Sequence, residues 1–182
     1  MSQINWVLEH KDYFNRKMNG YKDAESAIGP YLSTLPLIDR GVKIADLGCG
    51  NGMLLKFIVT FSGHNLVPWG NDVNDEAIDE AKRTVLPDYA TNFSIGDIDD
   101  TNYIGEPFDL IIANPFHART TPRVFTEKCM GKLTPAGKLI YRVHDDVLQT
   151  NGITSLSEVN ELNDMGIKSS TGYGLVFGTL EK

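Results

Sequence analysis

The sequence is short of cysteine, which excludes several kinds of site. Only Cys49 and Cys129 occur among 182 residues, and they lie far apart in dissimilar surroundings. There is no CxxC pair and no Cys/His cluster with metal-ligand spacing, so we expect no structural zinc and no other bound metal. Two isolated cysteines are typical of free thiols in a reducing compartment.

The sequence also lacks an excess of basic residues. It has 17 Lys and Arg against 24 Asp and Glu, which gives a net charge of −7. Proteins that bind nucleic-acid phosphates without regard to sequence usually carry a basic surface, because counterion release supplies most of that affinity. We therefore expect no nonspecific binding to nucleic acids.

Long apolar runs are absent as well. The most apolar stretch, Met53–Phe61, contains Lys56 and is far too short to span a bilayer. The first residues, MSQINWVLEHKDYF, lack the basic start and the apolar run of a signal peptide. These features predict a cytoplasmic protein with no membrane partner.

After residue 40 the sequence alternates between short apolar runs and longer amphipathic segments. Its length is that of one domain, in which we expect a helical extension over residues 1–40 and an α/β core over residues 41–182. The expected strands are Val42–Ala45, Leu66–Trp69, Phe93–Ile95, Phe108–Ala113, Lys138–Val143 and Tyr173–Leu180. The expected helices are Ile4–Met18, Met53–Phe61, Asp75–Leu86, Thr121–Leu133 and a segment from Ser155 to about Gly166. This alternation predicts a mainly parallel sheet.

Capping residues support two of the expected helices. Thr121 followed by Pro122 is typical of a helix start, because the hydroxyl accepts a backbone hydrogen bond and proline suits the first helical position. Ser155 and Glu158 have the spacing of a capping box, which predicts one continuous helix after them.

A polar residue follows each of the first five expected strands. These residues are Asp46, Asp72, Asp97, Asn114 and His144. In a parallel sheet all five fall on the carboxyl edge, where open α/β folds bind their ligands. The alternative explanation is that these residues are polar only because loops are polar and because Asp caps helices. It explains Asp75 well, but it explains Asp46 and Asp72 less well, because each of these lies a few residues before its helix.

Three alternating glycines, Gly48, Gly50 and Gly52, stand between the first expected strand and its helix. Such a loop allows a close backbone approach to a ligand and directs helix N-terminal amides at an anionic group. A dinucleotide fingerprint, GxGxxG, would need glycine at position 53, where the sequence has Met53. The loop therefore predicts ligand binding and disfavours NAD.

The segment over about residues 42–143 resembles the class I S-adenosylmethionine (SAM)-dependent methyltransferases, through DLGCGNG, GNDVNDEAIDEA, FSIGDI and LTPAGKLIY in order. The resemblance implies a Rossmann-like fold with a seven-stranded sheet, and SAM as the cofactor. It implies that the Asp72 carboxylate accepts hydrogen bonds from the ribose hydroxyls and that Asp97 lies next to the adenine amino group. The implied cofactor-binding residues are Asp46, Gly48, Cys49, Gly50, Asn51, Gly52, Asp72, Val73, Asp97, Ile98 and Asn114. Carboxylates suit these groups, because the hydroxyls and the amine are donors.

After the fourth expected strand, ANPFHART resembles the (D/N)PP(Y/F) signature of methyltransferases that act on amino groups, and NPFH is similar to the NPPFH of guanine-amine enzymes of ribosomal RNA, with one proline fewer. The resemblance implies a catalytic set of Asn114, Pro115, Phe116 and His117. By this resemblance the Asn114 side-chain oxygen and the Pro115 carbonyl accept hydrogen bonds from the target amine, and Phe116 stacks on the plane of that amine. His117 is a candidate for removing a proton.

Several functions remain open at this point. The leading hypothesis is a SAM-dependent methyltransferase whose methyl acceptor is open, and the NPFH segment indicates an amino group of an RNA or DNA base or of a protein amide. The acidic balance and the lack of a nucleic-acid module favour a small-molecule acceptor instead. Two further hypotheses are a nucleotide-linked oxidoreductase of Rossmann type and a SAM-binding protein without catalysis.

Overall fold

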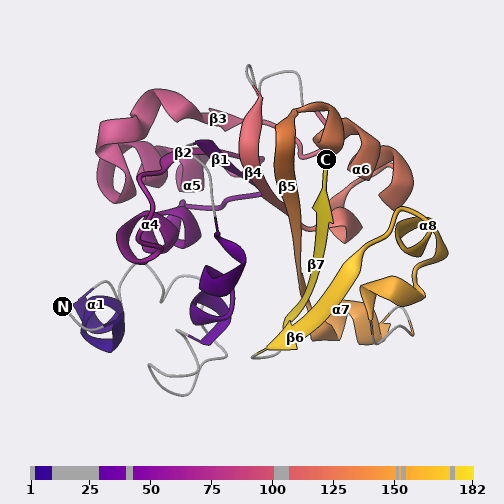
Figure 1. Ribbon diagram of the computed structural model, residues 1–182. Helices are drawn as coiled ribbons and strands as arrows, with labels where there is room; N and C mark the ends of the chain where they lie inside the picture. The colour runs from indigo at the N-terminus through magenta and orange to yellow at the C-terminus, as the bar shows by residue number, and fades with distance from the viewer. Residues whose placement is uncertain are drawn as a thin grey trace.

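Seven strands form a single sheet at the centre of the fold (Figure 1). The structure is a computed structural model that describes residues 3–9, 29–39, 43–100, 107–150, 152, 155–172 and 175–182. Within these residues the strands are β1 (Lys43–Leu47), β2 (Val67–Asp72), β3 (Phe93–Ile95), β4 (Phe108–Ala113), β5 (Leu133–His144), β6 (Lys168–Gly172) and β7 (Leu175–Glu181). Their order across the sheet is β3-β2-β1-β4-β5-β7-β6.

The first five strands run parallel, as the sequence predicts. β1 pairs in parallel with both β2 and β4, and the outer pairs β2·β3 and β4·β5 are parallel too. β7 is antiparallel to both of its neighbours, β5 and β6. This arrangement confirms the mainly parallel, seven-stranded α/β fold.

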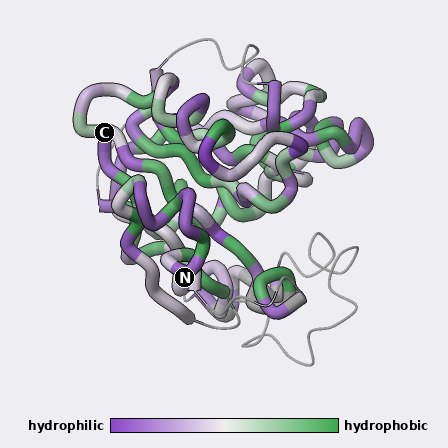
Figure 2. The backbone as a smooth tube through the Cα atoms, turned by 90° about the vertical axis from the view of Figure 1, so that its right-hand side faces the viewer, coloured by the Kyte–Doolittle hydropathy of each residue, from purple (hydrophilic) through white to green (hydrophobic). Residues whose placement is uncertain are grey.

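Helices cover both faces of the sheet (Figure 1). They are α1 (Gln3–Glu9), α4 (Met53–Phe61), α5 (Asp75–Glu80), α6 (Pro122–Gly131), α7 (Asp145–Thr150) and α8 (Asn160–Asn163), and a π-helical turn, η2 (Ala81–Val85), follows α5. In Figure 2 the most hydrophobic stretches run through the interior of the molecule, where the strands lie. Among the described residues, no helix has the length and apolar character needed to cross a bilayer.

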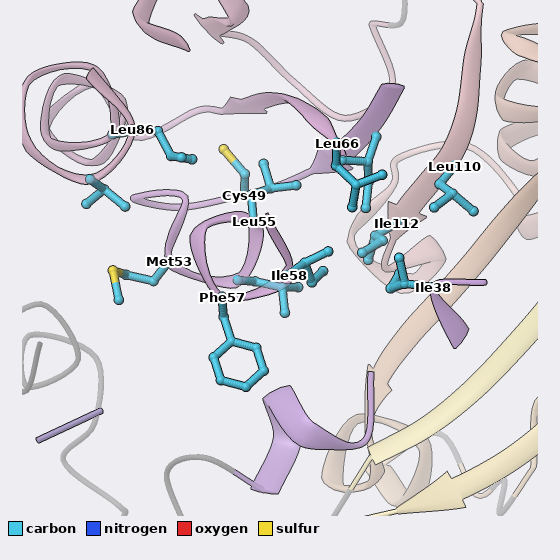
Figure 3. Close-up of a cluster of buried hydrophobic side chains, with 14 of the residues drawn as sticks. Ile38, Cys49, Met53, Leu55, Phe57, Ile58, Leu66, Leu86, Leu110 and Ile112 are labelled. Carbon is cyan, nitrogen blue, oxygen red and sulfur yellow. The ribbon is translucent and has the colours of Figure 1, made fainter. Parts of the chain in front are cut away.

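The first hydrophobic core lies between the sheet and α4 (Figure 3). Leu55, Phe57 and Ile58 of α4 are fully buried there against sheet residues such as Ile112. Burial of one such side chain contributes about 1.5–3 kcal/mol. The core therefore fixes α4, and with it the glycine-rich loop that precedes this helix.

The described part of the N-terminal extension packs on this first core. Trp6 of α1 lies edge-on to Phe57, with ring centroids 5.5 Å apart, and Tyr31 lies edge-on to the same ring at 5.4 Å. Lys138 Nζ of β5 forms an ion pair of 2.6 Å with Asp39, which fastens the end of the extension to the sheet. Residues 29–32 are helical. The expected helix over Ile4–Met18 is described as far as Glu9 only, and its remainder lies outside the described residues.

The second core lies on the opposite face, beneath α6, α7 and α8. Phe125 and Cys129 of α6 are fully buried there with Tyr141 of β5, whose hydroxyl is hydrogen-bonded to Thr126. Burial raises the pKa of the Cys129 thiol to about 12 and also raises the pKa of Tyr141. Cys129 is therefore a protonated, packed residue and not a reactive thiol.

Several expected elements have the observed bounds. Helix Met53–Phe61 and strands Phe93–Ile95 and Phe108–Ala113 are as predicted. Thr121 caps α6, because its hydroxyl accepts a hydrogen bond from the Val124 amide at 3.4 Å. The helix expected over Asp75–Leu86 changes from α to π geometry at Ala81.

Other expectations near the C-terminus were wrong. The continuous helix from Ser155 is instead a 3₁₀ turn, η6 (Leu156–Glu158), followed by the four residues of α8. The Ser155 hydroxyl accepts a hydrogen bond from the Ser157 amide, while its carbonyl accepts from the Glu158 amide, so Ser155 caps a turn. The extended backbone at Val159 then separates the two short elements. Two elements, α7 and the exposed edge strand β6, were not predicted.

We expect Gly178→Ala, in the middle of β7, to lower the free energy of unfolding by about 1–3 kcal/mol, as overpacking does. An added Cβ would lie 2.8 Å from Leu156 Cδ1 and 2.9 Å from Ile167 Cγ1. Gly131→Ala at the end of α6 is the control, because no described residue lies within 4 Å of its added Cβ. Urea denaturation measures both. Equal stability of the two variants would contradict the close packing of β7 on the second core.

Candidate functional site

The carboxyl edge of the sheet gathers the polar residues that end the parallel strands. Asp72 and His144 are the last residues of β2 and β5, and Asn114 directly follows β4. Asp46 stands one residue before the end of β1 and is buried. Because these strands are parallel neighbours, the structure places all of these residues along one edge, as the sequence predicts.

The glycine-rich loop after β1 is held in a conformation that only glycine adopts easily. The φ angles of Gly48, Gly50 and Gly52 are 82°, 55° and 77°, all in the left-handed region. The amides of Gly48 and Cys49 both donate to the Asn71 carbonyl at 2.9 Å. The loop is thereby tied to β2 and ends at Gly52, the N-cap of α4.

The Asp72 carboxylate holds the same loop from the other side. Its Oδ2 accepts from the Gly50 amide at 2.7 Å, and its Oδ1 accepts from the Asn74 amide at 2.9 Å. Each carboxylate oxygen keeps a second lone pair, so both can still accept hydroxyl donors from a ligand. Beside it are two exposed apolar side chains, Val73 and Ile95, with 67% and 59% of their surface exposed. A carboxylate next to exposed apolar surface suits a nucleoside.

Asp97 and Asp99 connect the loop after β3 to the segment after Pro115. Arg119 forms an ion pair of 2.8 Å with Asp97, and its backbone amide donates to Asp99. Thr120 Oγ1 also donates to Asp99, at 2.6 Å. Burial raises the pKa of Asp99, but the hydrogen bonds from Thr120 and Arg119 outweigh it and leave that pKa lowered. Asp97 is thus engaged by a cation that is 84% exposed and can move away from it.

The NPFH segment forms a 3₁₀ turn, η5 (Pro115–His117). The Asn114 Oδ1 accepts from the Phe116 amide at 3.1 Å, and its Nδ2 lies 3.2 Å from His117 Nε2. The amide nitrogen can only donate, so this contact is a hydrogen bond in the tautomer in which His117 Nε2 accepts. The Pro115 carbonyl accepts from the Ala118 amide at 3.3 Å. The Phe116 side chain is half-buried and packs on the second core.

A cleft of about 260 Å³ opens between the glycine-rich loop and the ends of β4 and β5. Its lining brings Asp46, Gly48, Cys49, Gly50 and Asn51 together with Asn114 and His117. The predicted site residues that do not line it are Gly52, Asp72, Val73, Asp97, Ile98, Pro115 and Phe116. Among the described residues, no group of three or more His, Cys, Asp or Glu is arranged to hold a metal ion.

Two polar side chains of the cleft lining, Tyr31 and Arg142, were not among the residues that the sequence analysis singled out, and the other unpredicted lining residues are apolar. The available signal for Arg142 is a single cation within the apolar run of the fifth strand, LIYRVH. Tyr31 carries no such signal, because its place in the cleft depends on how the extension packs on the first core.

Cys49 has a structural role as well as a place in the lining. A Cβ added to Gly70 would lie 2.7 Å from Cys49 Sγ, so the thiol packs closely against β2. Ile98, in turn, lies beside the glycine-rich loop, since its Cγ2 would be 3.5 Å from a Cβ on Gly48.

A sequence model of the methyltransferase domain family matches residues 44–137, just over half of the chain, and the chain therefore belongs to this family. This membership confirms the resemblance to class I SAM-dependent methyltransferases, with SAM as the cofactor. It favours methyl transfer over dinucleotide-linked oxidation. No curated protein sequence matches the chain.

Solved methyltransferase structures share the fold. A SAM-dependent methyltransferase from Aquifex aeolicus is 17% identical with a TM-score of 0.63, and the alignment covers 100% of this chain and 99% of that one. The N-methyltransferase NodS from Bradyrhizobium japonicum, in complex with S-adenosylhomocysteine (SAH), is 14% identical with a TM-score of 0.61, and the coverage is 98% and 96%.

TrmN from Thermus thermophilus is a longer relative of the same fold. It is 17% identical with a TM-score of 0.58, and the alignment covers 86% of this chain. This chain spans only 48% of TrmN and 61% of the CurJ carbon methyltransferase. These similarities establish the fold, and they leave the acceptor to be inferred from the cleft.

We expect the link between the two loops to weaken in acid. A carboxylate whose folded pKa is lowered stabilises the fold above its ordinary value, here 3.8, and this contribution is lost as the pH falls through the lowered folded pKa. Asp99→Asn should therefore lower the melting temperature at neutral pH and reduce the difference from wild type below about pH 4. Glu127→Gln, at an exposed position of α6, is the control and should melt like wild type at every pH. A constant difference across the pH range would contradict the role of the Asp99 charge.

Proposed function

We propose that this chain transfers a methyl group from SAM to an amino group of a small acceptor bound in the cleft at the carboxyl edge. The observation that carries the proposal is the cleft itself, in which the glycine-rich loop faces Asn114 and His117 across a space of about 260 Å³. The cofactor and the acceptor would meet where these two sides come together.

The residues at the edge fit SAM. We assign its methionyl part to Asp46 and the Gly48–Gly52 loop, since a buried carboxylate suits an ammonium group and the glycines allow a close approach. We assign the ribose to Asp72 and the adenine to Asp97, with Val73 and Ile98 as apolar neighbours. Adenine binding would displace the exposed Arg119 from Asp97, a small cost because exposed ion pairs contribute about 1 kcal/mol or less.

On the acceptor side the chain's own residues position an amine and remove its proton. When bound, SAM supplies an electrophilic methyl group whose transfer to an amine leaves SAH and one proton to be removed. The Asn114 Oδ1 has a lone pair beyond the one used by Phe116, so it can accept a hydrogen bond from the amine. We assign proton removal to His117, which lines the cleft and whose Nε2 takes the proton once it releases the hydrogen bond from Asn114 Nδ2. Most of the acceleration would come from positioning, which is worth up to about 7–11 kcal/mol.

The turn geometry favours a small acceptor over a nucleobase. A flat base would need the face of Phe116 open to the cleft, but this side chain packs on the second core and does not line the cleft. The Pro115 carbonyl is already engaged by the Ala118 amide. The acidic chain adds no general attraction for nucleic acid.

We expect Asp72→Asn to weaken SAH binding by about tenfold or more, because hydrogen bonds to a charged acceptor contribute about 1.5–3 kcal/mol. Asparagine keeps one oxygen that can accept from Gly50 or Asn74, so the loop should stay in place. Calorimetric titration with SAH measures the change. Asp79→Asn on α5 is the control, because Asp79 is exposed and pairs with Arg83 on the surface. An affinity equal to that of the control would remove Asp72 from the site.

We expect Asn114→Ala to leave SAH affinity within about twofold of wild type while methyl transfer falls about a hundredfold, the usual effect of a misplaced reactant. Transfer is followed with labelled SAM in separate reactions with a metabolite extract, a protein extract and nucleic acid. Asn163→Ala on the exposed part of α8 is the control. If wild type binds SAH but transfers no label to small molecules, protein or nucleic acid, the chain is a SAM-binding protein without catalysis.

A further inference from the structure

Arg142 is a cation set within a central strand. It lies in β5, which is flanked by β4 and β7, and its neighbours Tyr141 and Val143 are buried in the second core. Side chains alternate across a strand, so Arg142 turns to the opposite face, where the cleft lies. It lines that cleft together with Tyr31 and His144.

Among the residues that the structure describes, Arg142 has no carboxylate partner. Its Nε is buried and makes no hydrogen bond, and its guanidinium carbon lies 5.8 Å from the centroid of the Tyr31 ring. Tyr31 is fixed in turn by Phe57 of the first core. The Arg142 side chain as a whole is half-buried, but a buried donor such as its Nε costs free energy when it has no acceptor. The aromatic contact therefore holds the guanidinium in place without giving its Nε a hydrogen-bond acceptor.

The position of Arg142 indicates which ligand it serves. β4 separates β5 from β1, and the register aligns Asp46 with Ile112 and Ile112 with Ile140. Two strand spacings make roughly 10 Å, and Arg142 is a further two residues toward the carboxyl edge than Ile140. It thus lies away from the glycine-rich loop and on the side of Asn114, His117 and His144, which is the acceptor side under the proposed function.

We propose that Arg142 binds an oxyanion of the acceptor, a carboxylate or a phosphate, and so selects a small amine that carries such a group. The planar guanidinium fork matches both groups in a bidentate way. The negative net charge of the chain repels anions in general. Arg142 lines the cleft and has no carboxylate partner among the described residues. It therefore favours acceptors that carry an oxyanion over other amines. This inference rests on the proposed function for its division of the cleft into a cofactor side and an acceptor side.

Nitrogen-15 NMR of the arginine Nε–Hε groups tests the inference in the full chain. The protein is first saturated with SAH, which fills the cofactor side, and is then titrated with acetate and, separately, with inorganic phosphate. The Arg142 signal, assigned by its loss in Arg142→Lys, should shift and saturate with one of the two anions. The Arg83 signal, from an exposed surface pair, is the internal control and should not saturate.

Variants add a second measurement. Arg142→Gln should weaken the binding of the effective anion about tenfold or more, followed by backbone amide shifts, and Arg142→Lys should weaken it less, because the charge remains but the fork is lost. Both should bind SAH as wild type does. If Arg142→Gln does not fold, the wild-type titration and Arg142→Lys still decide the question.

Two outcomes would overturn the inference. In the first, the Arg142 signal shifts when SAH is added but not when 5′-methylthioadenosine, which lacks the carboxylate, is added. The signal of the SAH complex then shifts with neither anion. This result would mean that the guanidinium binds the carboxylate of the cofactor. In the second, no anion moves the signal. Failure of SAH to bind at all would instead count against the proposed function, and the anion titration of the free chain would still test Arg142 on its own.

Discussion

The site depends on one constraint, the parallel direction of β1 and β4 at the centre of the sheet. After β1 the chain passes to α4 on the first core, and after β4 it passes to α6 on the second core. Because the two connections leave toward opposite faces, the carboxyl ends of these strands stay uncovered between them, at the topological switch point. The glycine-rich loop and the η5 turn line the resulting cleft from its two sides. The polar residues at the strand ends have access to a ligand for this reason.

The sequence predicted the parts of the fold in which local pattern and burial agree. β4 is an apolar run interrupted only by Asp109 and is buried on both faces, and α4 is bounded by Gly52 and Ser62. β6 escaped prediction because four of its five residues are exposed and polar, so it has neither an apolar run nor an alternation. The helix expected after Ser155 was wrong because capping residues indicate where a helix can begin, while its length depends on packing. In this segment only Leu156 and Leu162 are fully buried.

The candidate site divides in the same way. The backbone of the glycine-rich loop and the row of polar residues follow from contiguous motifs, since each lies directly after a strand. The sequence could not indicate that Arg119 pairs with Asp97, or that the turn itself uses one lone pair of Asn114 Oδ1 and of the Pro115 carbonyl. The sequence could not indicate the contact between Tyr31 and Arg142 either, because these residues lie more than a hundred positions apart in the chain.

The outer strand β6 has a consequence for the protein at high concentration. Among the described strands it is the last in the sheet order, and β7 is its neighbour on the inner side. It carries Lys168 and a run of small polar side chains, and all but its last residue are well exposed. An outer strand edge is a template on which another chain can add, and charge with uniform polarity makes that addition unfavourable. The same lack of apolar residues that prevented the prediction of β6 thus makes edge-to-edge aggregation at this strand unfavourable.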